Sequence, residues 1–503
     1  MKYYLGIDVG TSSTKALLMG ADGIIVGTSQ KKYDIFHPCE GYDEQEINEL
    51  WDAACYTLRD LAARFPMEMR LVDGVGYSGQ MHGLVMLDAD GKPIRNCIIW
   101  SDLRSIDTIN DIYNTISPEE FNAVTLNRLS TGYLVSSLVW VRDHEPDNFA
   151  RMKTLLLPKD YVRYRMTGKI GTDMTDASST VIFDTAKRDW AWDFIDRLNL
   201  PRSIFPACHE AYEIAGEITS EAAELTGLRS GTPAVYGGGD TLMHEVGTCM
   251  IDESQPWVVN IGTSCQVSCA MQHAGYDKDY RTNTFCHVKE DLWMLMSVNL
   301  CGGSAMKWIS QQVYPGMDFV QQGALADTVG AGSDGLIFLP YLSGSRSPDV
   351  DPKARGMFMG LTMQHGQAHI VRSIMEGVIY SLRNCFETLK DIVHKEPDRL
   401  IASGGGARSD LLLQIEADMF NKPIYTTVEA EQSCIGAALT AAVGTGFFPS
   451  YEAACKQVVR FNDRVVEPIP RNVDVYNEYF EIYRLLYRQN KPLFDLYQHG
   501  GRS

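Results

Sequence analysis

The first hundred residues alternate between short apolar runs and small polar turns, a pattern typical of strands joined by tight turns. The first three runs predict a hairpin or meander. The strands predicted in this region span residues 3–8, 15–19, 24–28, 71–77, 84–87 and 97–100. Between them, residues 46–65 carry apolar side chains at helical spacing, which predicts an amphipathic helix.

The beginning of the chain has a counterpart in its second half. An apolar run at 257–261 leads into Gly262-Thr263-Ser264 and a further run at 265–271, much as the first run leads into Gly10-Thr11-Ser12. This repeat indicates an internal duplication, so we expect two large domains of similar construction, 1–245 and 246–503. The later elements predicted are strands at 234–236 and 400–403 and helices at 368–393, 409–420 and 473–493.

Composition narrows the class of protein. The chain has 503 residues, of which 45% are hydrophobic and 22% charged, so a disordered chain, a collagen-like fibre and a coiled coil are excluded. The formal net charge is −19 and we find no basic stripe, so a nucleic-acid backbone would be repelled. The excess negative charge favours solubility.

Targeting signals are not predicted. The N-terminal apolar stretch meets Asp8 too early for a signal peptide, and no run of about 18 apolar residues predicts a membrane-spanning helix. The 12 cysteines lack the dense spacing of a secreted scaffold and form no C-x-x-C motif. We therefore expect a cytoplasmic protein with reduced thiols and no membrane partner.

Three glycine-rich turns follow apolar strands, at Gly10-Thr11-Ser12-Ser13, Gly262-Thr263-Ser264 and Gly404-Gly405-Gly406-Ala407. Glycine lets a backbone approach a phosphate closely, and successive N–H groups form an anion nest. Two such turns facing each other across a cleft would hold a triphosphate. The alternative is that they are ordinary tight turns. No P-loop is present, and the single G-x-G-x-x-G at 74–79 lacks the following helix that a dinucleotide site requires.

Two carboxylates stand beside these turns. Asp8 ends the first predicted strand, and Asp240 follows three glycines. An acid beside an anion nest is suited to a cation or to accepting a proton. Asp8 would suit a Mg²⁺ ion that bridges phosphates, and Asp240 would suit a general base acting on a hydroxyl that attacks phosphorus. The alternative is that each acid caps a turn or a helix.

Motifs along nearly the whole chain resemble those of the FGGY carbohydrate kinases. Residues 6–12 resemble the family's first phosphate motif, and Gly237-Gly238-Gly239-Asp240 resembles the loop with its catalytic aspartate. Ser78-Gly79-Gln80-Met81-His82-Gly83 is most similar to the sugar motif of the family's xylulokinase branch, since glycerol kinases carry an Arg-Glu pair at Met81-His82. Further similar segments lie at 100–104, 157–161, 173–177, 340–344, 404–409 and 431–438.

The resemblance implies an α/β fold of two actin-like, ribonuclease-H-like domains with a cleft between them. It implies ATP and Mg²⁺ as cofactors, Asp8 at the metal and Asp240 as the base. Sugar contacts would fall to Met81, His82 and Asp240. Nucleotide contacts would fall to Thr11, Ser12, Ser13, Lys15, Gly262, Thr263, Gly303, Gly405 and Ser409. The partners expected are a small sugar, ATP and a second copy of the chain in a homodimer.

The substrate implied is a ketopentose, above all D-xylulose, phosphorylated to D-xylulose 5-phosphate. Three positions depart from the xylulokinase pattern: Ser137 where a lysine is usual, Thr241 where an asparagine is frequent, and Ser345 where a glutamate is frequent. Another ketose or polyol kinase of the family, acting on ribulose, fuculose or glycerol, is therefore an alternative. An actin- or chaperone-like ATPase and a catalytically inactive sugar sensor are alternatives from other classes.

Overall fold

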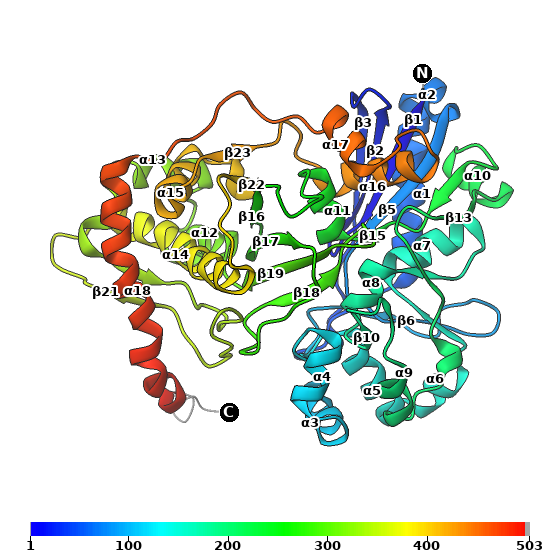
Figure 1. The fold of residues 1–503 in the computed structure, drawn as a ribbon, viewed down its shortest axis with the longest axis horizontal. Coiled ribbons are helices and arrows are strands. Elements are labelled where there is room, and N and C mark those ends of the chain that lie inside the picture. The colour runs from blue at the N-terminus through cyan, green and yellow to red at the C-terminus, as the bar shows by residue number, and fades with distance from the viewer. Residues whose placement is uncertain (1, 498–503) are drawn as a thin grey trace.

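Two β-sheets of similar construction form the centres of two lobes, with helices packed on their faces (Figure 1). The computed structural model describes residues 2–497. The first sheet has the order β13-β14-β5-β1-β2-β3, with β15 also paired to β5. Its strands are β1 (Tyr3–Val9), β2 (Ser13–Gly20), β3 (Ile25–Lys32), β5 (Val72–Gly79), β13 (Ile214–Glu217), β14 (Pro233–Val235) and β15 (Gly238–Gly239).

The second sheet repeats the central arrangement of the first, in the order β18-β19-β17-β16-β22-β23. Its strands are β16 (Trp257–Ile261), β17 (Cys265–Met271), β18 (Asn283–Cys286), β19 (Trp293–Asn299), β22 (Leu400–Gly404) and β23 (Ile424–Thr426). In each sheet the leading strand pairs antiparallel with the next strand and parallel with a later one. The predicted duplication is thus present in the strand pairing, and the α/β fold class is confirmed.

The helices predicted from the spacing of apolar residues are present in the structure. The helix predicted over 46–65 is α1, and those predicted over 368–393, 409–420 and 473–493 are α14, α15 and α18. The helices of the first lobe are α1 (Ile47–Arg64), α2 (Pro66–Arg70), α3 (Ile106–Thr115), α4 (Pro118–Thr125), α5 (Leu134–His144), α6 (Pro146–Arg151), α7 (Pro158–Thr167), α8 (Met174–Ser179), α9 (Trp192–Arg197), α10 (Ser220–Thr226) and α11 (Asp240–Gly247).

The second half of the chain contributes α12 (Gly303–Trp308), α13 (Phe319–Ala326), α14 (Gln367–Val393), α15 (Asp410–Phe420), α16 (Gln432–Gly444), α17 (Tyr451–Val458) and α18 (Pro470–Tyr497). Five short ribbons pair β4 (Glu44–Gln45) with β7 (Cys97–Ile98), β6 (Val85–Leu87) with β8 (Thr154–Leu156), β9 (Thr172–Asp173) with β12 (Cys208–His209), β10 (Phe183–Asp184) with β11 (Asp189–Trp190), and β20 (Ile337–Leu339) with β21 (Met357–Met359). The strand predicted at 97–100 is therefore shorter than expected.

Helix α16 crosses from the second half of the chain to the sheet of the first lobe, where it lies beside β1 and β5 (Figure 1). Glycines make this close approach possible. A Cβ atom on Gly6 would lie 1.9 Å from the carbonyl oxygen of Cys434, and one on Gly76 would lie 1.9 Å from that of Ala437. At least Gly76 of the isolated G-x-G-x-x-G therefore serves helix packing.

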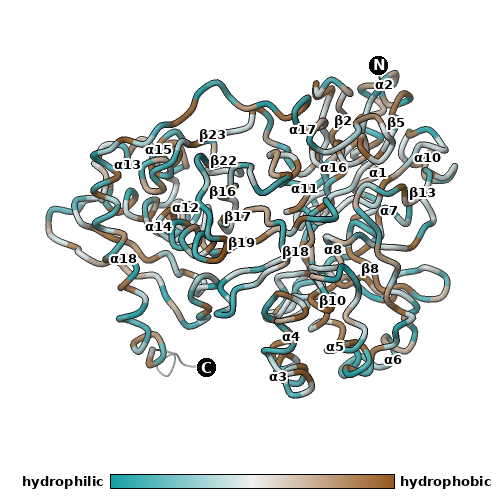
Figure 2. The backbone as a smooth tube through the Cα atoms, in the orientation of Figure 1, coloured by the Kyte–Doolittle hydropathy of each residue, from teal (hydrophilic) through white to brown (hydrophobic). Residues whose placement is uncertain are grey.

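Hydrophobic residues concentrate along both sheets and along the helices packed on them, while α18 on the outside alternates in character (Figure 2). All 12 cysteines lie among the described residues and none forms a disulfide. Within residues 2–497, no helix is both long and apolar enough to cross a membrane. The division of the chain near residue 245 stays a prediction.

Candidate active site

The ends of three adjacent strands bring the first turn, the sugar motif and the tri-glycine loop to one place. In the first sheet Asp8 on β1 lies opposite Ser78 on β5, and Ser78 lies opposite Gly238 on β15. Asp240 follows at once as the first residue of α11. Because these parallel strands end at the same edge of the sheet, Asp8 and Asp240 lie within electrostatic reach of each other.

Asp240 is held at one of its two carboxylate oxygens. The backbone N–H of Thr241 donates to Oδ1 at 2.7 Å, and the Thr241 hydroxyl donates to the same atom at 3.2 Å. No residue between 2 and 497 donates to Oδ2. Burial, followed by the charge of Asp8, raises the pKa of Asp240 to about 7, against the opposing effect of the two Thr241 bonds. A carboxylate with this pKa is suited to accept a proton near neutral pH.

Asp8 has a polar and partly accessible environment. The Ser78 hydroxyl donates to its Oδ1 at 2.7 Å. Burial raises the pKa of Asp8, while the Ser78 bond and the charge of Lys15 act in the opposite direction. Lys15 lies on β2 opposite Asp8, and its ammonium forms an ion pair with Glu431 at 2.6 Å. Asp8, Lys15 and Glu431 therefore form one charged group that joins β1, β2 and the start of α16.

The first predicted phosphate turn is held in place by side chains from several elements. Trp100 donates from Nε1 to the Thr11 hydroxyl at 2.9 Å, and Gln30 donates to the Ser13 hydroxyl at 2.8 Å. Ser12 lies between them and is exposed. The turn thus has a fixed backbone with an accessible tip, and the phosphate role of its residues stays a prediction, as does that of Lys15.

The second turn packs directly against Gly303, another predicted nucleotide contact. The N–H of Gly303 donates to the Gly262 carbonyl at 2.7 Å, and the N–H of Ser304 donates to the Thr263 carbonyl at 3.1 Å. Gly404 has a φ of +74° and a Cβ there would lie 2.5 Å from Asn260 Oδ1, so this position requires glycine. Gly262, Thr263, Gly303 and Gly405 are therefore gathered at one edge of the second sheet, and their nucleotide role remains a prediction.

Ser409, also predicted as a nucleotide contact, caps α15. Its hydroxyl accepts a bond from the N–H of Leu412 at 3.3 Å, as a helix N-cap does. This capping bond gives the Ser409 hydroxyl a structural role that is independent of nucleotide binding.

Met81 and His82 lie next to the tri-glycine loop. A Cβ on Gly239 would lie 3.0 Å from the Met81 sulfur, so the thioether packs on the residue before Asp240. The His82 ring donates from Nδ1 to the Ser179 carbonyl at 2.7 Å, which leaves Nε2 as the atom facing other partners. Burial lowers the pKa of His82 to about 3, so its imidazole is neutral.

Comparison with known protein families places both halves of the chain in one family. Residues 3–247 match the model of the N-terminal domain of the FGGY family of carbohydrate kinases, and residues 257–445 match that of its C-terminal domain. The chain belongs to the FGGY family. It is a carbohydrate kinase, and the family implies ATP as the substrate that provides the phosphoryl group.

Individual members of the FGGY family align along nearly all of the chain. A xylulose kinase from Bacillus subtilis (strain 168) is 31% identical over 98% of each chain. A gluconokinase from the same organism is 28% identical over 91% of this chain and 90% of its own. The solved structure of a ligand-bound xylulose kinase from Lactobacillus acidophilus superposes with a TM-score of 0.93 at 26% identity, over 99% of this chain and 100% of that one.

The FGGY motifs did not point to three residues that surround His82. Tyr133 packs edge-on against the His82 ring with centroids 4.7 Å apart, and Phe285 lies 6.0 Å from it. Arg346 donates to the Tyr133 hydroxyl at 3.0 Å. Phe285 and Arg346 come from the second half of the chain. Tyr133 shares a segment with Ser137, and Arg346 directly follows Ser345, so two of the three departures from the xylulokinase pattern were the available signal.

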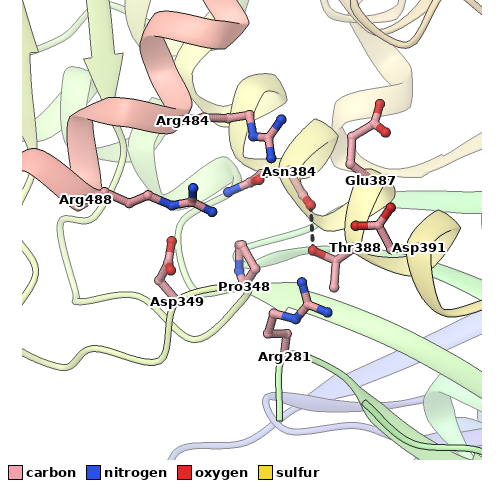
Figure 3. Close-up of a pocket in the computed structure, with 9 residues that line it drawn as sticks. All are labelled: Arg281, Pro348, Asp349, Asn384, Glu387, Thr388, Asp391, Arg484 and Arg488. Atoms are coloured by element: carbon pink, nitrogen blue, oxygen red, sulfur yellow. Dashed lines mark hydrogen bonds between the residues drawn. The ribbon is translucent and has the colours of Figure 1, made fainter. Parts of the chain in front are cut away.

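A separate polar cavity of this FGGY kinase, about 70 Å³ in volume, lies between α14, α18 and the segment at Pro348–Asp349 (Figure 3). Three arginines and three acids line it, and its Arg281 is already paired with Asp277 at 2.7 Å. None of the predicted site residues lines it. The charges compensate one another, so we do not assign the catalytic site to this cavity.

Proposed function

We propose that this FGGY kinase transfers the γ-phosphoryl group of ATP to the primary hydroxyl at C5 of D-xylulose, with Asp240 as general base. The observation that carries the proposal is the environment of Asp240: it begins a helix, its Oδ1 is fixed by Thr241, its Oδ2 is free of bonds within residues 2–497, and its pKa is raised to about 7. These are the properties that a base acting on a sugar hydroxyl needs.

The proposed reaction is a direct transfer. The sugar hydroxyl loses its proton to Asp240 as its oxygen attacks the γ-phosphorus in line, and the bond from phosphorus to the β-phosphate oxygen breaks to release ADP. The backbone N–H groups of the two turns stabilise the charge that develops on the phosphoryl oxygens. Met81 packs on the carbon skeleton of the sugar, and His82 offers one directed hydrogen bond to a sugar oxygen.

The residues present fit a Mg²⁺ ion. Asp8 and Asp240 are close enough for the charge of one to raise the pKa of the other, an arrangement that a divalent cation relieves. Mg²⁺ is typically held by one or two carboxylates together with substrate phosphates and waters, so a larger protein cage is not required. Asp8 would hold the ion, which would neutralise charge on the phosphates of ATP.

The identity of the sugar rests on the xylulose kinases among the relatives and on the pair Met81-His82. A specific observation favours a second candidate, an aldonate such as gluconate. The Arg346 guanidinium lies beside the Tyr133 ring, 5.9 Å from its centroid, and a guanidinium pairs well with a carboxylate. A gluconokinase is also among the relatives. Neither an actin-like ATPase nor a sugar sensor gains support, because the family is one of sugar kinases.

A substrate panel tests the proposal. Sugar-dependent ADP release is measured with D-xylulose, D-ribulose, L-fuculose, glycerol and gluconate at equal concentrations and saturating Mg²⁺ and ATP. We expect D-xylulose to give the highest kcat/KM. Faster phosphorylation of gluconate or glycerol would overturn the substrate, and ADP release that no sugar stimulates would overturn the kinase mechanism. The cytoplasmic location and the homodimer stay predictions.

A further inference from the structure

A single short helix, α8, contacts both sides of the candidate active site. At its beginning, the Thr175 hydroxyl accepts the backbone N–H of Gly239, the residue before Asp240, at 2.9 Å. At its end, the Ser179 carbonyl accepts the Nδ1–H of His82 at 2.7 Å. The six residues of α8 therefore hydrogen-bond directly to His82, the proposed sugar-binding residue. They also hydrogen-bond to Gly239, the neighbour of the proposed base.

The same helix also contacts the second lobe. The Ser178 hydroxyl accepts the backbone N–H of Cys286 on β18 at 3.0 Å. Cys286 directly follows Phe285, whose ring lies near His82. Helix α8 thus lies where the base loop, the sugar motif and the second lobe meet.

A buried group of charged side chains holds the N-terminal end of α8 in place. The Lys159 ammonium lies 2.7 Å from Asp160, 2.6 Å from Asp173 and 3.0 Å from Asp176, and all four side chains are completely buried. Asp173 is the N-cap of α8 and accepts the N–H groups of Thr175 and Asp176, at 2.8 and 3.1 Å. Asp173 also accepts the Thr175 hydroxyl proton at 2.5 Å, so this hydroxyl is fixed on both sides.

Arg163 joins the anchor to the tri-glycine loop on its other side. Its guanidinium pairs with Asp160 at 3.1 Å and lies 4.4 Å from the centre of the Tyr236 ring. Tyr236 immediately precedes Gly237-Gly238-Gly239. The loop that carries Asp240 is therefore held at its first residue through Arg163 and at its last glycine through Thr175.

Buried charge of this kind is weak evidence for stability, because desolvation offsets much of the attraction. The group contains two cations and three carboxylates, and burial raises the pKa of Asp176 well above its ordinary value, while the charge of Lys159 acts in the opposite direction. What the arrangement does provide is a fixed orientation of α8 relative to the loop that carries Asp240. Lys159 holds Asp173, the cap of α8, and the Thr175 hydroxyl that bonds to Asp173 accepts the backbone N–H of Gly239 in the base loop.

We propose that α8 aligns the base with the sugar and that Thr175 is the positioning residue for Asp240, acting through the N–H of Gly239 and anchored by Lys159. The proposal rests on the proposed function, because it assumes that Asp240 is the base. It predicts that Thr175 affects the orientation of the base in the transition state and leaves the binding of both substrates nearly unchanged.

Thr175→Val removes the hydroxyl with little change in volume, and Thr175→Ser retains it. Thr180→Val is the matched control, since it makes the same change in a buried threonine just after α8 whose hydroxyl bonds to the local backbone at Ala177 and Ile182. We expect Thr175→Val to lower kcat roughly 10- to 100-fold, because small displacements of catalytic groups have effects of this size. The KM values for sugar and ATP should change less than about threefold, and Thr175→Ser should restore most of kcat.

The kinetics are measured with the best sugar of the panel, alongside melting temperatures and Asp240→Asn as a reference. If Thr180→Val lowers kcat as much as Thr175→Val, or if Thr175→Ser fails to recover activity, the positioning role is wrong. If Thr175→Val does not yield folded protein, Thr175→Ala replaces it under the same criteria. A normal kcat for Asp240→Asn would overturn the proposed base, whereas a low kcat for Asp240→Asn with a normal one for Thr175→Val would overturn only the role of Thr175.

Discussion

The two sheets place different chemistry at the same position of one strand pattern. In the first sheet Asp8 on β1 lies between Lys15 on β2 and Ser78 on β5. In the second sheet the corresponding strands place Asn260 between Gln266 and Ser403. The backbone arrangement and the serine are retained, while a carboxylate and an ammonium are replaced by two neutral amides.

This difference fits the two roles that we propose for the repeated unit. A charged pair beside an anion nest can hold a cation and tune a neighbouring base, whereas amides beside a second nest add no charge that would repel phosphates. The helices that follow the two sheets differ as well. Asp240 begins α11 and forms no ion pair with any residue between 2 and 497, while Glu431 precedes α16 and is paired with Lys15.

The largest effect should come from Asp240, the acid that begins α11 in the first lobe. Asp240→Asn should lower kcat roughly 10²–10⁴-fold, the usual contribution of a general base, while ATP still binds. Steady-state kinetics and calorimetric titration with ATP measure the two quantities. Near-normal turnover by the Asn variant would show that the proton is taken elsewhere.

Exchanging the residues that distinguish the two sheets should have the next largest effect. Asp8→Asn makes the first sheet resemble the second, and we expect turnover to fall roughly 10- to 100-fold and the Mg²⁺ concentration for half-maximal activity to rise, because the proposed metal ligand is lost.

The reverse change, Asn260→Asp, adds a negative charge beside the second turn. It should raise the KM for ATP about fivefold or more through repulsion of the phosphates, with little effect on the sugar. Initial rates over a grid of Mg²⁺ and ATP concentrations measure both variants. Identical Mg²⁺ profiles for Asp8→Asn and the unmodified enzyme would remove the metal role from the first sheet.

A smaller effect, on sugar binding alone, is expected at His82. His82→Ala should raise the KM for the sugar roughly tenfold, because a hydrogen bond to a sugar oxygen is lost and its partner is left unpaired. The KM for ATP should hardly change. Equal increases for both substrates would place His82 outside the sugar site.

The smallest effect concerns stability and belongs to the second lobe. Glu416 on α15 is buried, neither of its carboxylate oxygens is hydrogen-bonded to a residue the structure describes, and burial raises its pKa to about 8. Because the folded state holds this proton more tightly than the unfolded state, stability falls as the pH rises from the ordinary pKa of about 4.5 to about 8.

Glu416→Gln should therefore raise the melting temperature by about 2 °C or more at pH 8.5 and change it less at pH 5. Thermal unfolding of both proteins at the two pH values measures this. A larger gain at pH 5 than at pH 8.5 would contradict the assignment.

The local pattern of apolar residues was sufficient to predict the leading strand of each sheet and the long helix α14. Apolar runs followed by Gly-Thr-Ser predicted β1 and β16, and the spacing over 368–393 predicted α14. The motifs also pointed to the neighbourhood of Asp8, Ser78 and Asp240, since strand ends meet at one edge of a sheet. The family resemblance supplied the kinase activity, which periodicity alone does not contain.

What the sequence could not provide is contact between distant segments. Nothing near Lys15 indicates that Glu431 pairs with it, and nothing near His82 indicates that Arg346 reaches Tyr133 from the other half. Such pairs are set by how the two lobes pack, not by local spacing. Helix α8 was matched as a motif, yet its link to Gly239 depends on a register across separate strands.

The seating of α16 on the first sheet has a consequence for how the chain is made. Gly6 meets Cys434, so contacts in the core of the first lobe join segments more than 400 residues apart. At about 5–20 residues per second, synthesis reaches this helix only after roughly 20–90 s. Until then the face of β1 and β5 remains uncovered, and closing so long a loop is slow. A nascent chain ending before residue 432 should therefore bind a chaperone that recognises apolar surface, and the first lobe should acquire resistance to protease only when α16 has emerged.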